Sequence, residues 1–179
     1  TVSVSVSGGT LFMNGSAVVV ADIFASNGVA HGINGVLIPS NVSLGGSTIW
    51  ELIQSDNRFS KLEHALRETG LAHELANSNA EFTMFLPTND AFHRLGSVKL
   101  HWLFKSKSRL RAVLKNHIVV NQTLDIATLR SQGRVTNANH NRLAITQSNG
   151  RTYVNNSRVQ QADERAKNGI AHVISSVLL

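Results

Sequence analysis

The sequence contains no cysteine, and only 2 of its 179 residues are proline. The missing cysteines exclude a disulfide scaffold, a zinc site with thiolate ligands and a cysteine nucleophile. No stretch approaches the ~18 to 20 consecutive apolar residues that a membrane helix needs. The sequence also lacks a basic start followed by a long apolar region, so we expect any secretion signal to have been removed or to lie outside it.

Aromatic residues are few, at 6%, and the 11 acidic residues are outnumbered by 17 lysines and arginines. The net charge of +6 and the pI near 10.3 favour polyanionic partners, namely nucleic acid, sulfated glycan, acidic lipid or an acidic protein. Nucleic acid fits least well, because basic and aromatic residues do not alternate and no recognition motif is present. The hydrophobic content of 42% predicts a globular chain.

An internal repeat with a constant offset of 141 residues organises the chain. Residues 1–38 align without a gap on residues 142–179, and 15 of the 38 positions are identical. This period is far too long for a solenoid repeat, so it indicates tandem copies of a whole domain. We therefore predict that residues 1–39 are the C-terminal part of a preceding domain, residues 40–46 a linker and residues 47–179 a nearly complete domain.

Helical signals come first in this nearly complete domain. Capping boxes are predicted at Thr48 with Glu51 and at Ser60 with Glu63, each before apolar residues at helical spacing. Gly70 is expected to end the second of these helices. Shorter helical patterns then continue to residue 116, around one short buried strand at 82–86 that stops at the following proline.

Strand signals dominate after the helices. They cover residues 118–120, 134–136, 143–146, 151–154 and 171–174. The pair Asn149-Gly150 predicts a hairpin turn between two of these strands. Helices first and strands later favour an α+β domain with segregated layers, preceded by an opening segment that contains only strands and turns.

Three ordered motifs carry a family resemblance. They are residues 82–92 (FTMFLPTNDAF), residues 114–119 (LKNHIV) and residues 168–174 (NGIAHVI), and residues 27–37 repeat the last of them. Together they resemble the signatures of fasciclin-like domains. The resemblance implies a wedge-shaped β-sandwich with flanking helices, in tandem, on secreted or membrane-anchored adhesion and matrix proteins.

The resemblance also implies partner-contact residues. In matrix members of the family, integrin contact is attributed to an Asp-Ile pair before the closing Asn-Gly and to a Tyr-His segment. By position these become Asp22-Ile23 and Asn116-His117, with Asp163 in the second copy. The second copy departs from the pattern, since glutamate follows Asp163 and asparagine replaces the tyrosine. We also expect Asp22 and Asp163 to hydrogen-bond the backbone of a nearby loop.

The eight histidines are scattered, and no two have the spacing of a metal site. His31, His117 and His172 lie beside apolar residues within the family motifs, so we expect core or hydrogen-bonding histidines. Nucleophile-elbow, phosphate-loop and dinucleotide motifs are missing. These observations predict a protein that is not an enzyme and uses no cofactor and no catalytic or metal residues.

Positive charge concentrates between residues 105 and 115. The cluster consists of Lys105, Lys107, Arg109, Arg111 and Lys115. One interpretation is a solvated helix face, because the alternating spacing spreads the charges around a helix. The other is a contact for sulfated glycosaminoglycan or acidic lipid, held by an attraction that salt would weaken.

Four sequons for N-linked glycosylation occur, at Asn14, Asn41, Asn121 and Asn155. They agree with an extracellular protein, either secreted or anchored at the cell surface. We expect Asn41 to be exposed, because it lies in the predicted linker.

The function predicted from these patterns is an extracellular adhesion or matrix-interaction module. Its partners would be an integrin-type receptor, a matrix protein, a glycan or a second copy of the chain, since the opening strands lack a helical half to cover their apolar face. The alternative is a carrier of an apolar, carotenoid-type ligand. Its groove would be formed by Trp50, Phe59, Trp102, Phe104 and neighbouring leucines.

Overall fold

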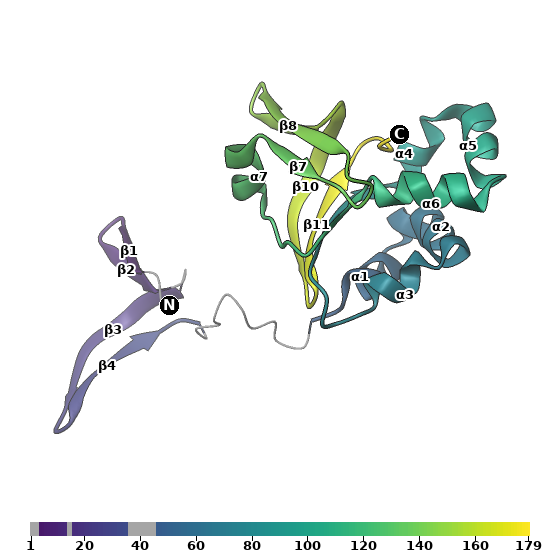
Figure 1. Ribbon diagram of the computed structural model, residues 1–179. Coiled ribbons are helices and arrows are strands. Elements are labelled where there is room, and N and C mark those ends of the chain that lie inside the picture. Colours follow the sequence, from purple (N-terminus) through teal and green to yellow (C-terminus); the bar gives the residue numbers. More distant parts are fainter. Residues whose placement is uncertain (1–3, 14–15, 36–45) are drawn as a thin grey trace. The chain divides into compact units, whose positions relative to one another are not determined.

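The computed structural model describes residues 4–13, 16–35 and 46–179. The chain divides into two compact units, Thr1–Leu44 (unit 1) and Gly45–Leu179 (unit 2) (Figure 1). The described part of unit 1 forms four strands, β1 Val4–Ser7, β2 Thr10–Met13, β3 Ser16–Ala25 and β4 Gly28–Ile33. Each pairs antiparallel with the next, in the order β1-β2-β3-β4.

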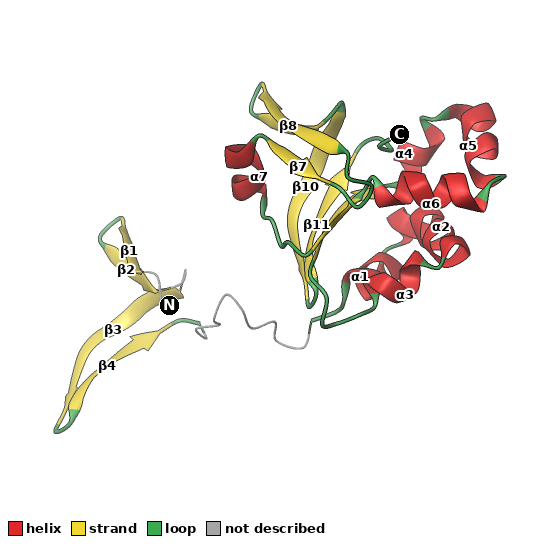
Figure 2. Ribbon diagram, in the orientation of Figure 1, coloured by secondary structure: helices red, strands yellow, loops and turns green. Residues whose placement is uncertain are grey.

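Unit 2 places helices against a seven-stranded sheet (Figure 2). The helices are α1 Ile49–Ser55, the 3-10 helix η1 Asn57–Phe59, α2 Ser60–Thr69, α3 Leu71–Leu75, α4 Asn89–His93, α5 Gly96–Phe104, α6 Lys107–Lys115 and α7 Ile126–Gln132. The strands are β5 Phe82–Pro87, β6 Ile118–Val120, β7 Arg134–Thr136, β8 Arg142–Ser148, β9 Arg151–Val154, β10 Ser157–Ala166 and β11 Gly169–Ile174. Their order is β6-β5-β11-β10-β9-β8-β7, with β5 and β11 parallel.

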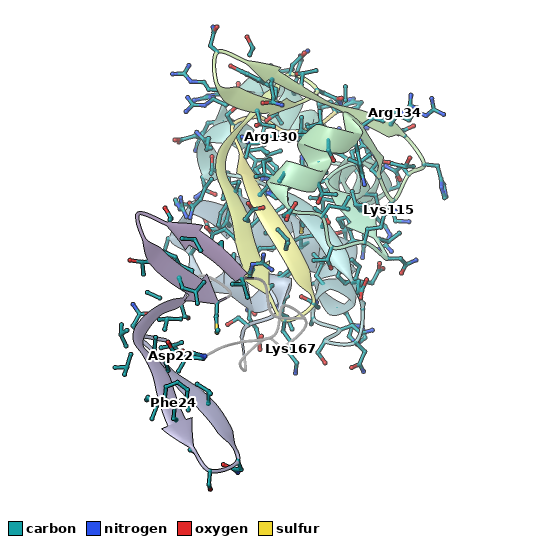
Figure 3. The ribbon with its side chains drawn as sticks, turned by 90° about the vertical axis from the view of Figure 1, so that its left-hand side faces the viewer. Asp22, Phe24, Lys115, Arg130, Arg134 and Lys167 are labelled. Atoms are coloured by element: carbon teal, nitrogen blue, oxygen red, sulfur yellow. The ribbon has the colours of Figure 1, made fainter. Side chains whose placement is uncertain are left out.

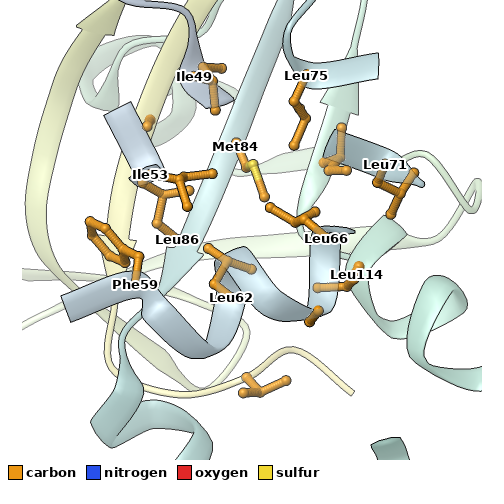
Figure 4. Close-up of a cluster of buried hydrophobic side chains, with 14 of the residues drawn as sticks. Ile49, Ile53, Phe59, Leu62, Leu66, Leu71, Leu75, Met84, Leu86 and Leu114 are labelled. Carbon is orange, nitrogen blue, oxygen red and sulfur yellow. The ribbon is translucent and has the colours of Figure 1, made fainter. Parts of the chain in front are cut away.

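The buried strand β5 divides the core between two clusters. Met84 and Leu86 point to one face and pack under the helices with Ile53 and Leu66 (Figure 4). Phe85 points to the other face, into a second cluster with residues of β6 to β9, β11 and α7. A continuous sheet can enclose this second cluster only by folding over on itself. The predicted α+β sandwich with flanking helices is therefore confirmed.

The predicted segregation of layers is only partly correct. The helices do precede most of the strands, but β5 arises within the helical half and lies inside the sheet between β6 and β11, parallel to β11. A parallel neighbour requires a long connection. The chain meets this requirement by forming α4 to α7 and β6 to β10 between the two strands.

The caps show how local sequence sets the helix starts. The capping box at Thr48 is present, because its hydroxyl accepts from the Glu51 backbone N–H while the Glu51 carboxylate accepts from the Thr48 N–H. The second predicted box is wrong. Asp56 caps η1, which runs directly into α2, so Ser60 is already the first helical residue and has no capping bond. Gly70 ends α2 as predicted.

The sequence patterns do not predict β10 and α7. Two register shifts interrupt β10, between Val159 and Gln161 and between Gln161 and Glu164, so its side chains do not alternate regularly. The short helix α7 starts at its N-cap Asp125 and buries only Leu129, which leaves almost no apolar periodicity. The predicted turn at Asn149-Gly150 does join β8 to β9.

The sequence repeat extends to the backbone. The bounds of β3 and β4 coincide with those of β10 and β11 at the offset of 141 residues. Their pairing registers coincide as well, since Ala25 pairs with Gly28 as Ala166 pairs with Gly169, and both hairpins contain the same two register shifts. Asp22 and Asp163 both adopt positive φ, at 56° and 62°.

Unit 1 presents many large apolar side chains to solvent. Phe24 on β3 is 80% exposed and is labelled beside Asp22 in Figure 3. The other exposed apolar residues of this unit are Val4, Val6, Val19, Val20, Ile23 and Val29. Among them, Val29 is 51% exposed, whereas its counterpart Ile170 is buried in unit 2, which agrees with the expectation that the opening strands expose an apolar face.

Candidate interaction surfaces

Asp163 sits at the bulge of β10 and binds the backbone of the complete unit. Its carboxylate Oδ1 accepts from the Ile126 N–H at 2.8 Å, where α7 begins. Its own N–H donates to Nδ1 of His172 at 3.2 Å. The predicted bond from this aspartate to loop backbone is confirmed. The same bond occupies the carboxylate that the family resemblance offered to a partner.

His172 is the internal counterpart of that aspartate. Because Nδ1 accepts from Asp163, Nε2 carries the proton and donates to the Leu124 carbonyl oxygen at 2.9 Å. Burial lowers the pKa of the imidazole from its ordinary value, so the ring is neutral near pH 7. The ring also stacks on Phe85, with the two centroids 5.8 Å apart. His172 is a core histidine, as predicted.

His117 is a second core histidine, and this location corrects the prediction that it contacts a partner. The side chain is 0% exposed. Nδ1 donates to the Val113 carbonyl oxygen at 2.8 Å, and Nε2 accepts from the Leu178 N–H at 2.9 Å. Burial lowers the pKa of His117 to about 4. A fully buried ring with both nitrogens bonded has no surface to offer a receptor.

Asn116 belongs to an amide cluster at the end of α6. Its Oδ1 accepts from the side-chain amides of Asn139 at 2.8 Å and Asn137 at 3.2 Å, and its Nδ2 donates to the Leu178 carbonyl oxygen at 3.4 Å. This cluster fixes the turn between β7 and β8 against the helix. Asn116 is half-buried and retains only part of its surface for a partner.

Asp22 and Ile23 are accessible in unit 1. The Asp22 side chain is 68% exposed and Ile23 is 48% exposed. The Asp22 N–H donates to Nδ1 of His31 at 3.1 Å, which reproduces the bond between Asp163 and His172. Of the predicted receptor contacts, this pair offers the most surface.

The basic cluster around α6 divides into engaged and free residues. Arg109 donates to the Trp102 carbonyl oxygen, and its guanidinium lies 3.5 Å from the centroid of the indole ring. Arg111 donates to the Thr69 carbonyl oxygen at 2.6 Å and pairs with Glu74 at 2.7 Å. Lys105 and Lys107 are exposed. The segment therefore presents fewer free cations than its sequence suggests.

Replacing Arg111 with glutamine should lower the free energy of unfolding by about 1–2 kcal/mol, because the carbonyl at the end of α2 loses a charged donor. Lys107→Gln removes the same charge without such a bond and should change stability by less than about 0.5 kcal/mol. Urea unfolding of both variants measures the difference. Equal values would show that the Arg111 bonds do not stabilise the fold.

The aromatic residues predicted to form one apolar groove are dispersed. Phe59 is buried in the core, Trp50 lies under Arg67, and Trp102 lies under Arg109. Phe104 lines a cavity of about 500 Å³ between α2 and α5, and the other lining residues are Ser60, Lys61, His64, Ser97, Leu100 and His101. The prediction of a single aromatic groove is wrong, although one of its residues does line an apolar cavity.

The sequons differ in accessibility. Asn121 is exposed, at positive φ just after β6. Asn155 is also exposed, but its Oδ1 accepts from the Ala144 N–H at 2.9 Å. Asn14 and Asn41 lie outside the described residues, as does most of the predicted linker.

A further set of arginines, not predicted as a site from the sequence, lies on the second half of unit 2. They are Arg130, Arg134, Arg142, Arg151 and Arg158, on α7 and on β7 to β10. A sequence signal was available, since residues 126–162 contain these five arginines and no aspartate or glutamate. Their wide spacing conceals the cluster, which only the pairing of the strands assembles.

Two further properties concern the described ranges alone. Across residues 4–13, 16–35 and 46–179, no group of three or more His, Cys, Asp or Glu side chains is arranged to hold a metal ion. In the same part of the chain, no helix has both the length and the apolarity to cross a bilayer.

Comparison with known proteins identifies the family. The Fasciclin domain family matches residues 1–39 and 57–179. This chain belongs to the fasciclin domain family. The match includes both copies of the internal repeat, and it confirms the resemblance that the three motifs carry.

Two relatives and one solved structure show the scope of the similarity. The chain is 32% identical over 131 residues to transforming growth factor-beta-induced protein ig-h3 from Sus scrofa, covering 73% of this chain and 19% of the relative. It is 30% identical over 166 residues to stabilin-1 from Homo sapiens, covering 89% and 6%. The chain thus spans under a fifth of these relatives.

The solved structure is a FAS1 domain pair from the insect cell adhesion molecule fasciclin I. The TM-score is 0.66 at 21% identity, over 99% of this chain and 66% of that one. At this identity the comparison shows a shared fold. It confirms the fasciclin-type architecture of the chain.

Proposed function

We propose that the chain is an extracellular adhesion or matrix-interaction module without enzymatic activity. Its family membership supports the proposal, together with a fold shared with a domain pair from a cell adhesion molecule. The hydrogen bonds of the two buried histidines and of Asp163 also support the proposal. His117 and His172 have both ring nitrogens bonded within the domain, and Asp163 binds α7, so these groups serve the fold.

We further propose that residues 1–39 are the closing strands of a preceding fasciclin domain, joined through residues 40–46 to the domain formed by residues 47–179. The support is the common strand bounds, register and bulges of the two hairpins at the offset of 141 residues. On β4, the exposed Val29 corresponds to Ile170, which is buried in unit 2, as expected of a strand that an intact domain would cover.

A cell-attachment assay tests the adhesion function. Wells coated with the full chain should retain cells after washing, and soluble chain added in excess should block attachment. The double variant Asp22→Ala/Ile23→Ala should reduce attachment if the exposed pair on β3 contacts the receptor. Attachment no greater than on an albumin-coated well would contradict the proposed function.

A second candidate is the carrier of an apolar ligand, favoured by the cavity at Phe104. Its volume of about 500 Å³ falls within the usual range for small-molecule sites, and Leu100 and Phe104 provide apolar walls. Organic extraction of purified protein, followed by absorption spectroscopy and mass spectrometry, tests this function. A stoichiometric apolar compound would support it, and an extract without one would exclude it.

A further inference from the structure

A small pocket lies where α7 meets β9 and β10. Its volume is about 250 Å³, and its lining includes the three arginines Arg130, Arg151 and Arg158 together with Thr152. The other lining residues are apolar or uncharged and include no carboxylate: Ile126, Gly150, Val159, Gln160 and Ala162. Three cations around one pocket repel one another, so the site favours an anion at its centre.

The arginines of this pocket have no carboxylate partner among the described residues, although a hydrogen bond positions one of them. The Arg130 Nε donates to the Thr152 hydroxyl at 2.7 Å, which orients the guanidinium and leaves its terminal nitrogens available. Among the described residues, no carboxylate lies within ion-pairing distance of Arg130, Arg151 or Arg158. A guanidinium matches the paired oxygens of a sulfate or phosphate group through parallel N–H bonds.

Positive charge continues beyond the pocket along one face of the sheet. Val135 and Leu143 are buried and point inward. Their chain neighbours Arg134 and Arg142 therefore lie on the outer face of the adjacent strands β7 and β8, where they are diagonal neighbours. Figure 3 labels Arg130 and Arg134 on this part of unit 2. A single small anion would use only the pocket. A polymer with repeated anionic groups can use the pocket and the arginines around it.

We propose that this arginine cluster binds a sulfated glycosaminoglycan, with one sulfate ester in the pocket between Arg130, Arg151 and Arg158. The volume suits a small charged group better than a complete drug-sized ligand. The rest of the polymer then remains in solvent beside Arg134 and Arg142. This inference rests on the proposed extracellular function and identifies the class of glycan partner. It places the main polyanion contact on α7, β9 and β10, away from α6.

Heparin binding by the full chain tests the site. The variant Arg151→Gln/Arg158→Gln should weaken binding about tenfold or more at 0.15 M salt. It should also reduce the slope of log K against log salt by about 2, one unit for each lost contact. The matched control Lys105→Gln/Lys107→Gln removes the same charge from the α6 segment and should change affinity less than threefold. Thermal unfolding verifies that both variants fold.

The controls separate a specific sulfate site from general attraction between opposite charges. Chemically desulfated heparin should lose the affinity, and phosphatidylserine vesicles should bind wild type and both variants equally weakly. Equal losses in the two double variants would overturn the proposal, since they would indicate that only the net charge matters. Tighter binding to the vesicles than to heparin would overturn it as well. So would a larger loss of heparin affinity in Lys105→Gln/Lys107→Gln than in Arg151→Gln/Arg158→Gln. Cells that attach normally to the Arg151→Gln/Arg158→Gln variant would contradict a glycan role in adhesion and leave the adhesion function standing.

Discussion

Replacing Gly169 with alanine is expected to destabilise unit 2 more than alanine at Gly70, Gly96, Gly133 or Gly150. Gly169 begins β11, where it pairs with Phe82 of β5. A Cβ at this position would lie 2.8 Å from the carbonyl carbon of Phe82 and 3.0 Å from its nitrogen, and closer still to the carbonyl oxygen. These are backbone atoms of the neighbouring strand, so relief requires that the parallel pair separate.

The backbone angle adds to the effect of the clash. At Gly169 φ is 148°, a region that residues with a side chain rarely adopt. We expect Gly169→Ala to lower the free energy of unfolding by about 4 kcal/mol or more, the range of severe core defects. For a domain of this size, that corresponds to a fall in melting temperature of about 10 °C or more. Differential scanning calorimetry provides the measurement.

Two glycine variants serve as controls. Gly150→Ala also introduces a side chain at positive φ, at 72°, but meets no atom within 4 Å. It should cost only about 1 kcal/mol. Gly28→Ala, the equivalent of Gly169→Ala in unit 1, likewise meets no atom within 4 Å. A loss at Gly169 no larger than at Gly150 would refute the proposed close approach of β5 and β11.

Gly28 also provides a test of the proposed half-domain. In an intact preceding domain, a strand equivalent to β5 would lie against β4 as β5 lies against β11. The same alanine should then cost only the strain of its φ, 159°, in this chain, and much more in a longer chain that contains the whole preceding domain. Equal losses in both chains would contradict the assignment of residues 1–39 to a fasciclin domain.

Much of this fold could be predicted because it is specified locally. Thr48 and Glu51 are only three residues apart and form their capping box without help from distant parts of the chain. The same holds for Gly70 at the end of α2 and for the turn at Asn149-Gly150. The duplication added long-range information, because a motif that occurs twice at one offset identifies a domain rather than an element.

Features that depend on distant contacts were not predictable in the same way. The Ser60 box failed because Asp56 starts an earlier turn, and β10 was missed because its bulges break the alternation. Arg111 reads as a surface cation, yet it binds α2 and α3. The candidate glycan pocket depends on strand pairing that brings Arg151 and Arg158 beside α7.

Acid is expected to destabilise unit 2 through its two buried histidines. In the unfolded chain a histidine has its usual pKa near 6.5, whereas burial lowers the pKa of His117 to about 4 and also lowers that of His172. At a pH between the folded-state and the unfolded-state pKa of a ring, the unfolded chain binds more protons than the folded one. The free energy of unfolding should therefore have its full value above about pH 6.5 and decrease as the pH falls toward 4.

The expected loss from His117 is about 3 kcal/mol when the pH has fallen to 4, because each pKa unit corresponds to 1.36 kcal/mol. Urea unfolding between pH 7.5 and 4.5 should show proton uptake on unfolding, to which His117 contributes close to one proton and His172 adds a further part. His117→Gln should remove one proton from this uptake, and His73→Gln controls for the loss of an exposed histidine. If the glutamine variant does not fold, NMR titration of the wild-type ring provides a second measurement. A His117 ring that protonates near pH 6.5 in the folded protein would contradict the assignment, because a charged imidazole could not accept the Leu178 N–H.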